Sequence, residues 1–404
     1  MTQHRIAPDS ELAHYMDAIG VGDNASECLT CGACSSRCTW FDGNGGPLPR
    51  QMVRMAALGL DQPLIDSHML WDCLICNRCT QACPMEIKMD MVVRKGRSLA
   101  AAAPITPEAI STGLRTRLDV GDVNGLTAEE FAETIEWVSE EFVDEMEDDK
   151  AKIVYDRTDC SFLYMPNPRE LGINLLHLTA MARLFYAMGE TWTLSSAHTD
   201  VTNWGYFTGK DAILKQLCLR VVDGAEKLGA DTLVLSECGH AYHVYKYLLP
   251  DIIGRDPGFR VMSMPELILE YAQNGRLTLD PKVHPYKIAF HDPCNIARKS
   301  GGYEAPRALL AMCCQGVAEL FPNREDGICC GGGGGVLQDA TSTRKRMISG
   351  KPKADQMRAT GLSHIATACL SCHRQLGELS KHFKLDMTVN TVAALASESL
   401  ILDR

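Results

Sequence analysis

The sequence contains no apolar run approaching the 18 residues expected of a membrane-spanning helix. Its first residues, Met1–Arg5 leading into Asp9–Glu11, lack the apolar core of a signal peptide. Basic residues are also in deficit, because 40 lysines and arginines face 51 acidic residues and leave a net charge of −11. That balance argues against nucleic acid or an anionic membrane surface as a partner. We therefore expect a cytoplasmic chain with no transmembrane segment of its own and with a protein or small thiol as its partner.

Cysteine is abundant, with 18 residues in a chain of 404. Such a chain is long enough for two or three domains, each with its own core. In a secreted protein this many cysteines would indicate disulfides, whereas in a reducing compartment closely clustered cysteines more often bind metals or carry redox chemistry. We adopt the second interpretation.

Two runs of four cysteines share the spacing Cys-x2-Cys-x2-Cys-x3-Cys, which is typical of bacterial two-cluster ferredoxins. In those domains the fourth cysteine of each run binds the other cluster. The first predicted [4Fe-4S] set is Cys28, Cys31, Cys34 and Cys83, and the second is Cys73, Cys76, Cys79 and Cys38. Zinc ribbons would use four ligands in all and leave half of these cysteines unexplained. Thr39 departs from the pattern, since proline follows the fourth cysteine there, as Pro84 follows Cys83.

Two helical segments are expected near these runs. Residues 46–60 predict a helix that ends near Gly59, followed by Trp71 just before the second run. Residues 116–150 form a connector without lysine or arginine between Arg117 and Lys150. In this connector apolar residues recur at helical spacing from Phe131 to Met146, so we predict an amphipathic helix with an acidic outer face. That face is interpreted as solvated surface, with a docking site for a basic partner as the alternative.

From residue 151 onward, short apolar runs alternate with helical stretches, the pattern of parallel α/β units. The clearest predicted strands are 231–235, 287–290 and 364–368. Loops that follow such strands are where α/β folds place their chemistry.

Five further cysteines gather in the last third of the chain and include an adjacent pair beside a run of glycines. They are Cys294, Cys329, Cys330, Cys369 and Cys372, and we call them the C-terminal cysteine group. Glycines such as Gly331 and Gly332 let the backbone come close to a bound group, so the pattern suits a metal-sulfur cluster. Cys369–His373 matches a c-type haem attachment signature, but that chemistry belongs to an exported compartment. The glycines are no phosphate loop, because no Gly-Lys-Ser/Thr follows them.

The order Cys, gap, Cys-Cys-Gly, gap, Cys-x-x-Cys resembles the CCG domain of heterodisulfide reductase B and D subunits. The resemblance implies that the C-terminal cysteine group holds a non-cubane [4Fe-4S] cluster that cleaves a disulfide. The first part, with its helix between the two runs, is similar to the all-helical ferredoxin domain of the C subunit. Together they resemble the D-type fusion. The resulting prediction is a helical ferredoxin domain (1–115), the acidic connector (116–150), and two α/β CCG domains with parallel sheets (151–283 and 284–404).

The two α/β regions are predicted to be copies of one fold, related by a constant offset of 134 residues. This offset places Cys160 on Cys294, Ser195–Ser196 on Cys329–Cys330, and Leu235 and Cys238 on Cys369 and Cys372. Serine and leucine cannot replace thiolate ligands, so the first copy should hold no complete cluster. Cys160 and Cys238 are nonetheless expected to lie near each other.

In the mechanism that the resemblance implies, the two ferredoxin clusters carry electrons to the C-terminal cysteine group, where the S–S bond breaks. His291 and His373 are candidate proton donors, and His240 is a further one, although each is more often structural. One cluster-binding copy beside a decayed one is most similar to the DsrK family of DsrMKJOP sulfur-metabolism complexes. That similarity implies a quinone-linked cytochrome b partner (DsrM-like), a place on the inner face of the membrane, and a DsrC-like carrier of a disulfide or trisulfide.

Two alternatives remain open. The iron-sulfur subunit of a glycolate or glycerol-3-phosphate oxidoreductase has similar motifs and passes electrons from a flavin subunit. A non-catalytic electron-transfer subunit would also carry such clusters.

Overall fold

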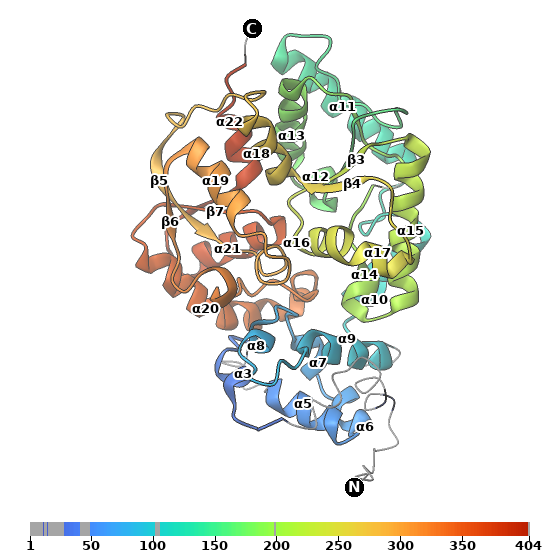
Figure 1. The fold of residues 1–404 in the computed structure, drawn as a ribbon, viewed down its shortest axis with the longest axis vertical. Coiled ribbons are helices and arrows are strands. Elements are labelled where there is room, and N and C mark those ends of the chain that lie inside the picture. The colour runs from blue at the N-terminus through green and yellow to red at the C-terminus, as the bar shows by residue number, and fades with distance from the viewer. Residues whose placement is uncertain are drawn as a thin grey trace.

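The computed structural model describes residues 11, 14, 28–40, 49–101, 106–197 and 199–402. The cysteine-rich helices form the lower part of the molecule in Figure 1, and two α/β units lie side by side above them. We call residues 28–101 the ferredoxin part, residues 151–283 the first sheet unit and residues 284–402 the second sheet unit.

The ferredoxin part is built from short helices and has its own small core. Its helices are α3 (Ala33–Ser36), α5 (Pro49–Ala57), α6 (Asp61–Ile65), α7 (Met69–Asp72), α8 (Arg78–Gln81) and α9 (Met89–Ala100). The helix predicted between the cysteine runs is confirmed as α5, which is followed by Gly59 at a φ of +65°. Trp71 is buried in the core with Met52 and Val93, so the helices pack around it.

The connector contains α10 (Glu108–Asp119), which crosses the boundary predicted at residue 115, and α11 (Ala128–Met146). The amphipathic helix predicted here is confirmed, since Phe131, Ile135, Val138 and Phe142 are the buried residues of α11. A capping box between Thr127 and Glu130 sets its start by satisfying two free backbone N–H groups.

The first sheet unit has a four-stranded parallel sheet in the order β2-β1-β3-β4. Its strands are β1 (Phe162–Met165), β2 (Trp192–Thr193), β3 (Thr232–Leu235) and β4 (Arg260–Ser263). Its helices are α12 (Pro168–Gly172), α13 (Leu175–Met188), α14 (Trp204–Thr208), α15 (Asp211–Leu228), α16 (Gly239–Ala241), the π-helix η1 (Tyr242–Leu248), α17 (Leu249–Ile253) and α18 (Met264–Gln273).

The second sheet unit has a parallel sheet in the corresponding order β6-β5-β7-β8. Its strands are β5 (His284–His291), β6 (Cys314–Glu319), β7 (His364–Thr367) and β8 (Thr388–Thr391). Its helices are α19 (Glu304–Cys313), the 3-10 turns η2 (Arg324–Asp326), η3 (Val336–Gln338) and η4 (Ala340–Ser342), then α20 (Thr343–Ala359), α21 (Leu370–His382) and α22 (Val392–Glu398). Two such sheets confirm the predicted α/β class with parallel strands, and the three clearest predicted strands correspond to β3, β5 and β7.

The constant offset of 134 residues is wrong. Cys160 lies before β1, where its carbonyl accepts the N–H of Asp231 at the start of β3, whereas Cys294 follows β5. Cys238 follows the other end of β3, so Cys160 and Cys238 lie at opposite ends of the first sheet and are not neighbours. Only two of the five pairs match cysteine with cysteine, and their shared offset is a coincidence.

The strand registers give a different correspondence between the two sheets. Met165 pairs with Leu235 at the end of β1 and β3, and His291 pairs with Thr367 at the end of β5 and β7. Counted from these residues, Pro168 stands where the second unit has Cys294, Glu237 where it has Cys369, and His240 where it has Cys372. The carboxyl edge of the first sheet therefore presents a proline, a carboxylate and an imidazole in place of three thiols.

A buried ionic network joins the two sheet units behind this edge. The ring of His177 on α13 lies between two fully buried carboxylates, 3.3 Å from Glu170 and 3.2 Å from Glu237. Glu237 also accepts the N–H of Val392 at 3.0 Å, and the same imidazole lies 3.2 Å from the hydroxyl of Thr391. Although burial acts in the opposite direction, the carboxylates raise the pKa of His177 to about 10. The imidazolium thus holds the units together.

This raised pKa predicts a pH-dependent stability. A histidine charged only in the folded state stabilises fully below its unfolded pKa of about 6.5 and loses the contribution as pH rises toward its folded pKa. We expect the His177→Gln variant to be less stable by up to about 4 kcal/mol near pH 6, with the difference from the wild type shrinking toward pH 10. Denaturant unfolding under anaerobic, reducing conditions measures it. The exposed His382 supplies the control, because His382→Gln should show no such trend.

Candidate iron-sulfur site

The eight ferredoxin cysteines line two adjoining cavities, in the sets that their spacing predicts. One cavity is lined by Cys38, Cys73, Cys76 and Cys79, which we call the proximal set. The other is lined by Cys28, Cys31, Cys34 and Cys83, the distal set, together with Cys79. The shared Cys79 shows that the two sets are neighbours. Cys38 thus lies with the second run and Cys83 with the first, while α3 and α8 pack against each other; that each set binds a cluster stays a prediction.

The C-terminal cysteine group converges at the carboxyl edge of the second sheet. Cys294 follows β5, Cys369 and Cys372 flank the start of α21, and Cys329 and Cys330 come from the long loop after β6. The sulfur atoms of Cys330 and Cys372 are 3.2 Å apart and share a hydrogen bond. A disulfide would be about 2.05 Å long, so these are free thiols in contact.

The protonation of these thiols follows from their mutual contacts. Hydrogen bonds with Cys329 and Cys372 lower the pKa of Cys330 well below its ordinary value, and a hydrogen bond with Cys372 lowers the pKa of Cys369. The pKa values of Cys329 and Cys372 are raised in turn, because hydrogen bonds with neighbouring sulfurs favour their protonated forms. The buried cysteine sulfurs are soft donors that contact one another and share protons. They suit a metal-sulfur cluster, because such a cluster requires thiolate ligands.

The proximal set touches the C-terminal cysteine group. A hydrogen bond with Cys329 lowers the pKa of Cys76 to about 5. Cys329 also belongs to a small apolar cluster with Leu74 and Trp40. Cys38 and Cys76 pack against this cluster. Two residues of the proximal set therefore lie directly beside the C-terminal cysteine group, although the contacting pair Cys76 and Cys329 is 253 residues apart in sequence.

Two glycines make this approach possible. A Cβ on Gly334 would lie 2.3 Å from the carbonyl oxygen of Cys73, and one on Gly333 would lie 2.7 Å from that of Leu74. Gly331, at a φ of +95°, donates its N–H to the sulfur of Cys329 at 3.5 Å. The glycine run is thus a contact surface for the ferredoxin part.

A fully buried arginine holds the same junction. Arg97 donates from its guanidinium to the carbonyls of Leu70 (2.9 Å), Cys73 (2.7 Å), Phe207 (3.0 Å) and Gly334 (2.9 Å). These partners belong to the ferredoxin part and both sheet units. Burial lowers the pKa of Arg97 to about 10, so the group remains charged at neutral pH. One side chain therefore joins all three parts next to the proximal set.

A cavity of about 130 Å³ opens beside the C-terminal cysteine group, between the carboxyl edges of the two sheets. Its lining includes residues of the first edge (Asn167, Pro168, Arg169, Gly239, His240) and of the second (Cys294, Asn295, Cys330, Cys369, Ser371, Cys372, Arg374). Gly332–Gly335, Trp204 and Phe207 complete much of the wall. Crevices outside the carboxyl ends of strands are where α/β folds bind ligands.

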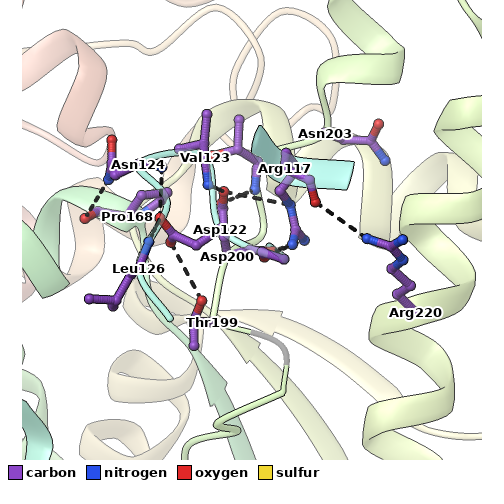
Figure 2. Close-up of polar contacts among 12 residues, drawn as sticks. Arg117, Asp122, Val123, Asn124, Leu126, Pro168, Thr199, Asp200, Asn203 and Arg220 are labelled. Carbon is purple, nitrogen blue, oxygen red and sulfur yellow. Dashed lines mark hydrogen bonds and ion pairs between the residues drawn. The ribbon is translucent and has the colours of Figure 1, made fainter. Parts of the chain in front are cut away.

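The loop after α10 supplies another part of the wall through Val123 and Asn124. Figure 2 shows how it is held: Asp122 accepts the N–H of Asn124 at 2.7 Å, and Asp200 accepts the N–H of Val123 at 3.0 Å. Arg117 donates to the carbonyl of Asp200 beside them. Burial raises the pKa of Asp200 to about 6. The connector therefore shapes the cavity as well as linking domains.

The three candidate proton donors take different positions. His291, at the end of β5, is buried with Cys330 and Cys372, and one ligand atom from each of the three lies within 4.8 Å of the others. His373 directs Nε2 to the carbonyl of Val389, 3.0 Å away, and is not among the described residues that line the cavity. His240 lines the cavity, 3.3 Å from the sulfur of Cys238, and burial lowers its pKa to about 4. Their role in proton transfer remains a prediction.

Sequence reasoning missed the buried cations around the site. Lys353 on α20 is buried behind the cysteine group, and burial lowers its pKa to about 8. Arg97 carried a readable signal, because it falls on the apolar face of α9 with Met89, Val93 and Ala100. A charged residue on a buried helix face indicates a specific partner.

Comparison with protein families assigns both cysteine-rich regions. Residues 24–87 match the 4Fe-4S dicluster domain, and residues 288–377, which contain the whole C-terminal cysteine group, match the Cysteine-rich domain called CCG. The chain therefore combines two cysteine-rich iron-sulfur domain types that known families share. Both matched domains indicate 4Fe-4S clusters. The C-terminal thiols are free and in contact, and they fit such a group.

Similar proteins extend the match over most of the chain. The D subunit of the dihydromethanophenazine:CoB–CoM heterodisulfide reductase of Methanosarcina barkeri is 24% identical, covering 92% of this chain and 93% of its own length. An Hdr-like menaquinol oxidoreductase iron-sulfur subunit of Archaeoglobus profundus is 22% identical, with coverages of 93% and 79%. A "probable membrane-anchored ferredoxin" of Chromohalobacter salexigens is 24% identical over 86% of this chain, which spans only 56% of that relative. None of the described helices is long and apolar enough to cross a membrane.

Proposed function

We propose that this chain is the catalytic iron-sulfur subunit of an oxidoreductase that interconverts a disulfide with two thiols, or a trisulfide with a thiol and a persulfide. The distal and proximal sets would each hold a cubane [4Fe-4S] cluster, and the C-terminal cysteine group a non-cubane one. The observation that carries the proposal is the contact between Cys76 and Cys329, which joins the proximal set to a thiol group that opens on a cavity. In this proposal electrons pass from the proximal set to the C-terminal cysteine group, where the substrate binds.

The reaction is a two-electron exchange. A disulfide takes up two electrons and two protons, its S–S bond breaks, and two thiols leave. Clusters held by these cysteines would supply the two electrons and an electrophilic iron for the reacting sulfur. The chain's own residues do the rest: the five cysteines fix the reacting position, the glycine run brings the ferredoxin part close, and Trp204 and Phe207 exclude water from one wall. His240, which lines the cavity, and His291, which lies beside Cys330 and Cys372, are the proposed proton donors to the leaving sulfur.

The partners in this proposal follow the DsrK-like resemblance. They are a quinone-linked cytochrome b subunit of a membrane complex (DsrM-like) and a DsrC-like carrier protein that presents the sulfur chain. The Archaeoglobus relative is named as part of a menaquinol oxidoreductase, which supports a quinone-linked assembly. We place the chain at the inner face of the cytoplasmic membrane, held there by its partner subunits.

An assay of the anaerobically prepared full chain tests this function. With reduced viologen as electron donor, the wild type should reduce a disulfide to two thiols, and Cys372→Ser should lose at least about a hundredfold of the rate, because its sulfur contacts Cys330 at the centre of the group. Cys314→Ala, at the start of β6, is the control and should retain the rate. Glycolate-dependent reduction that requires a flavin subunit, without disulfide turnover, would instead support the alternative assignment.

A further inference from the structure

The cavity beside the C-terminal cysteine group contains a guanidinium that forms no ion pair with a carboxylate among the described residues, although Glu378 acts on it from a distance. Arg169, on α12 at the carboxyl edge of the first sheet, lines the cavity and is partly buried. Its Nη2 atom is buried and has no hydrogen-bond partner in the part of the chain that the structure describes. Burial lowers the pKa of Arg169, but arginine stays charged in proteins. A buried donor atom left unpaired is costly, so this group is placed to receive an anion.

A second guanidinium lies on the opposite wall. Arg374 follows Cys372 by two residues on α21 and also lines the cavity. Its positive charge lowers the pKa of Arg169, so the two groups are close enough to repel each other. Arg374 is exposed and pairs with Glu378 through Nε at 2.8 Å, which leaves its terminal nitrogens available. Two guanidinium groups on the walls of one cavity suit the binding of a carboxylate or another planar oxyanion.

The position of this pair relative to the thiols matters. The charges of Cys369 and Cys238 both raise the pKa of Arg169, so the guanidinium lies within electrostatic range of the cysteine group. A hypothetical Cβ on Gly239, next to Cys238, would lie 3.5 Å from the sulfur of Cys369, so the two edges are in contact there. An anion held by Arg169 and Arg374 would therefore sit a few bonds away from a sulfur placed against the C-terminal cysteine group. Ile173, 82% exposed, marks the mouth of the cavity.

We propose that the substrate of this site is an anionic disulfide, whose carboxylate is bound by Arg169 and Arg374 while its S–S bond lies against the C-terminal cysteine group. The proposal rests on the disulfide reductase function above and defines its substrate class. A carboxylate close to the sulfur, as in a short thiol acid, satisfies the geometry. An uncharged disulfide of the same shape offers no carboxylate to Arg169 or to the terminal nitrogens of Arg374.

The test compares two isosteric disulfides on the full, anaerobically prepared chain with reduced viologen. Dithiodipropionate carries two carboxylates and is reduced by two electrons and two protons to two mercaptopropionate molecules, whereas its diamide is uncharged. We expect the wild type to show a KM for the acid at least about tenfold below that for the diamide. Arg169→Gln should raise the KM of the acid roughly tenfold without changing that of the diamide, and Arg169→Lys should lie between. Arg260→Gln, at an exposed ion pair with Glu270, is the matched control.

A binding measurement separates this proposal from the proposed function. Thiodipropionate has one sulfur and no S–S bond, so it cannot be reduced, and calorimetry should show that it binds the wild type more tightly than it binds Arg169→Gln or Arg374→Gln. If the wild type reduces neither disulfide but binds thiodipropionate through these arginines, the reductase function fails and the anion site stands. Equal KM values for acid and diamide in the wild type, with thiodipropionate binding unchanged in Arg169→Gln, would overturn the anion site and leave Arg169 as a counter-charge to the thiolates.

Discussion

Replacing Gly334 with alanine should separate the ferredoxin part from the C-terminal cysteine group. The new Cβ would lie 2.3 Å from the carbonyl oxygen of Cys73 and 2.9 Å from the Cα of Leu74. Both contacts are with backbone, so no side chain can rotate away to relieve them. We expect the loop that carries Cys73 and Cys76 to move outward. The loss should be at least about 3 kcal/mol in unfolding free energy, and electron transfer between the two sites should slow strongly.

Gly361 offers a matched control for this variant. Gly334 has a φ of +64° and Gly361 one of +66°, but a Cβ on Gly361 would meet no atom within 4 Å. Gly361→Ala therefore carries only the cost of a left-handed backbone, about 1 kcal/mol. Denaturant unfolding of both variants isolates the clash, and EPR of the reduced protein reports whether the proximal and C-terminal centres still interact magnetically. Equal behaviour of the two variants would show that the glycine run does not serve as the contact surface.

Replacing Arg97 with methionine should have the other large effect. Four backbone carbonyls from three parts of the chain would lose their donor in a buried environment, and each unsatisfied group costs about 1–3 kcal/mol. We expect a loss of at least about 3 kcal/mol in unfolding free energy, even though methionine fills much of the volume. Removing a positive charge beside Cys73 should also make reduction of the proximal centre harder, because the added electron loses a favourable interaction.

Two measurements distinguish these consequences. Denaturant unfolding gives the stability, and a redox titration followed by EPR gives the reduction potential of the proximal centre, which should become more negative. Arg97→Lys keeps the charge but offers fewer donors, so it should retain the potential better than the stability. Arg115→Met, at an exposed position on α10, serves as the control. A potential unchanged in Arg97→Met would show that the charge does not act on this centre.

How much of the fold and of the candidate site could be predicted from the sequence depends on how local each feature is. The ferredoxin sets were predictable because three of the four ligands in each set fall within seven residues, so short turns decide their geometry. The strands β3, β5 and β7 were predictable because parallel strands buried on both faces are continuous apolar runs. The adjacent pair Cys329 and Cys330 indicated a cluster site through residue type alone.

Features that depend on packing between distant segments could not be predicted. The contact between Cys76 and Cys329 and the four-fold donation by Arg97 depend on how three parts of the chain meet, which no local pattern encodes. The offset of 134 residues failed because loop lengths differ between the sheet units, and only the strand registers show that His240 stands in the place of Cys372. The sequence around Arg169 gives no sign of a binding site. Only when the opposite wall of the cavity is in place can its Nη2 atom be seen to lack a hydrogen-bond partner among the described residues.

The most direct test of the account is a combined iron analysis and EPR spectrum of the anaerobically prepared full chain, with and without an added disulfide. We expect about twelve iron atoms per chain, in three four-iron centres. The disulfide should perturb the spectrum of one centre, which should be magnetically coupled to its neighbour. About eight iron atoms, with a spectrum that the disulfide leaves unchanged, would contradict a third iron site at Cys294, Cys329, Cys330, Cys369 and Cys372.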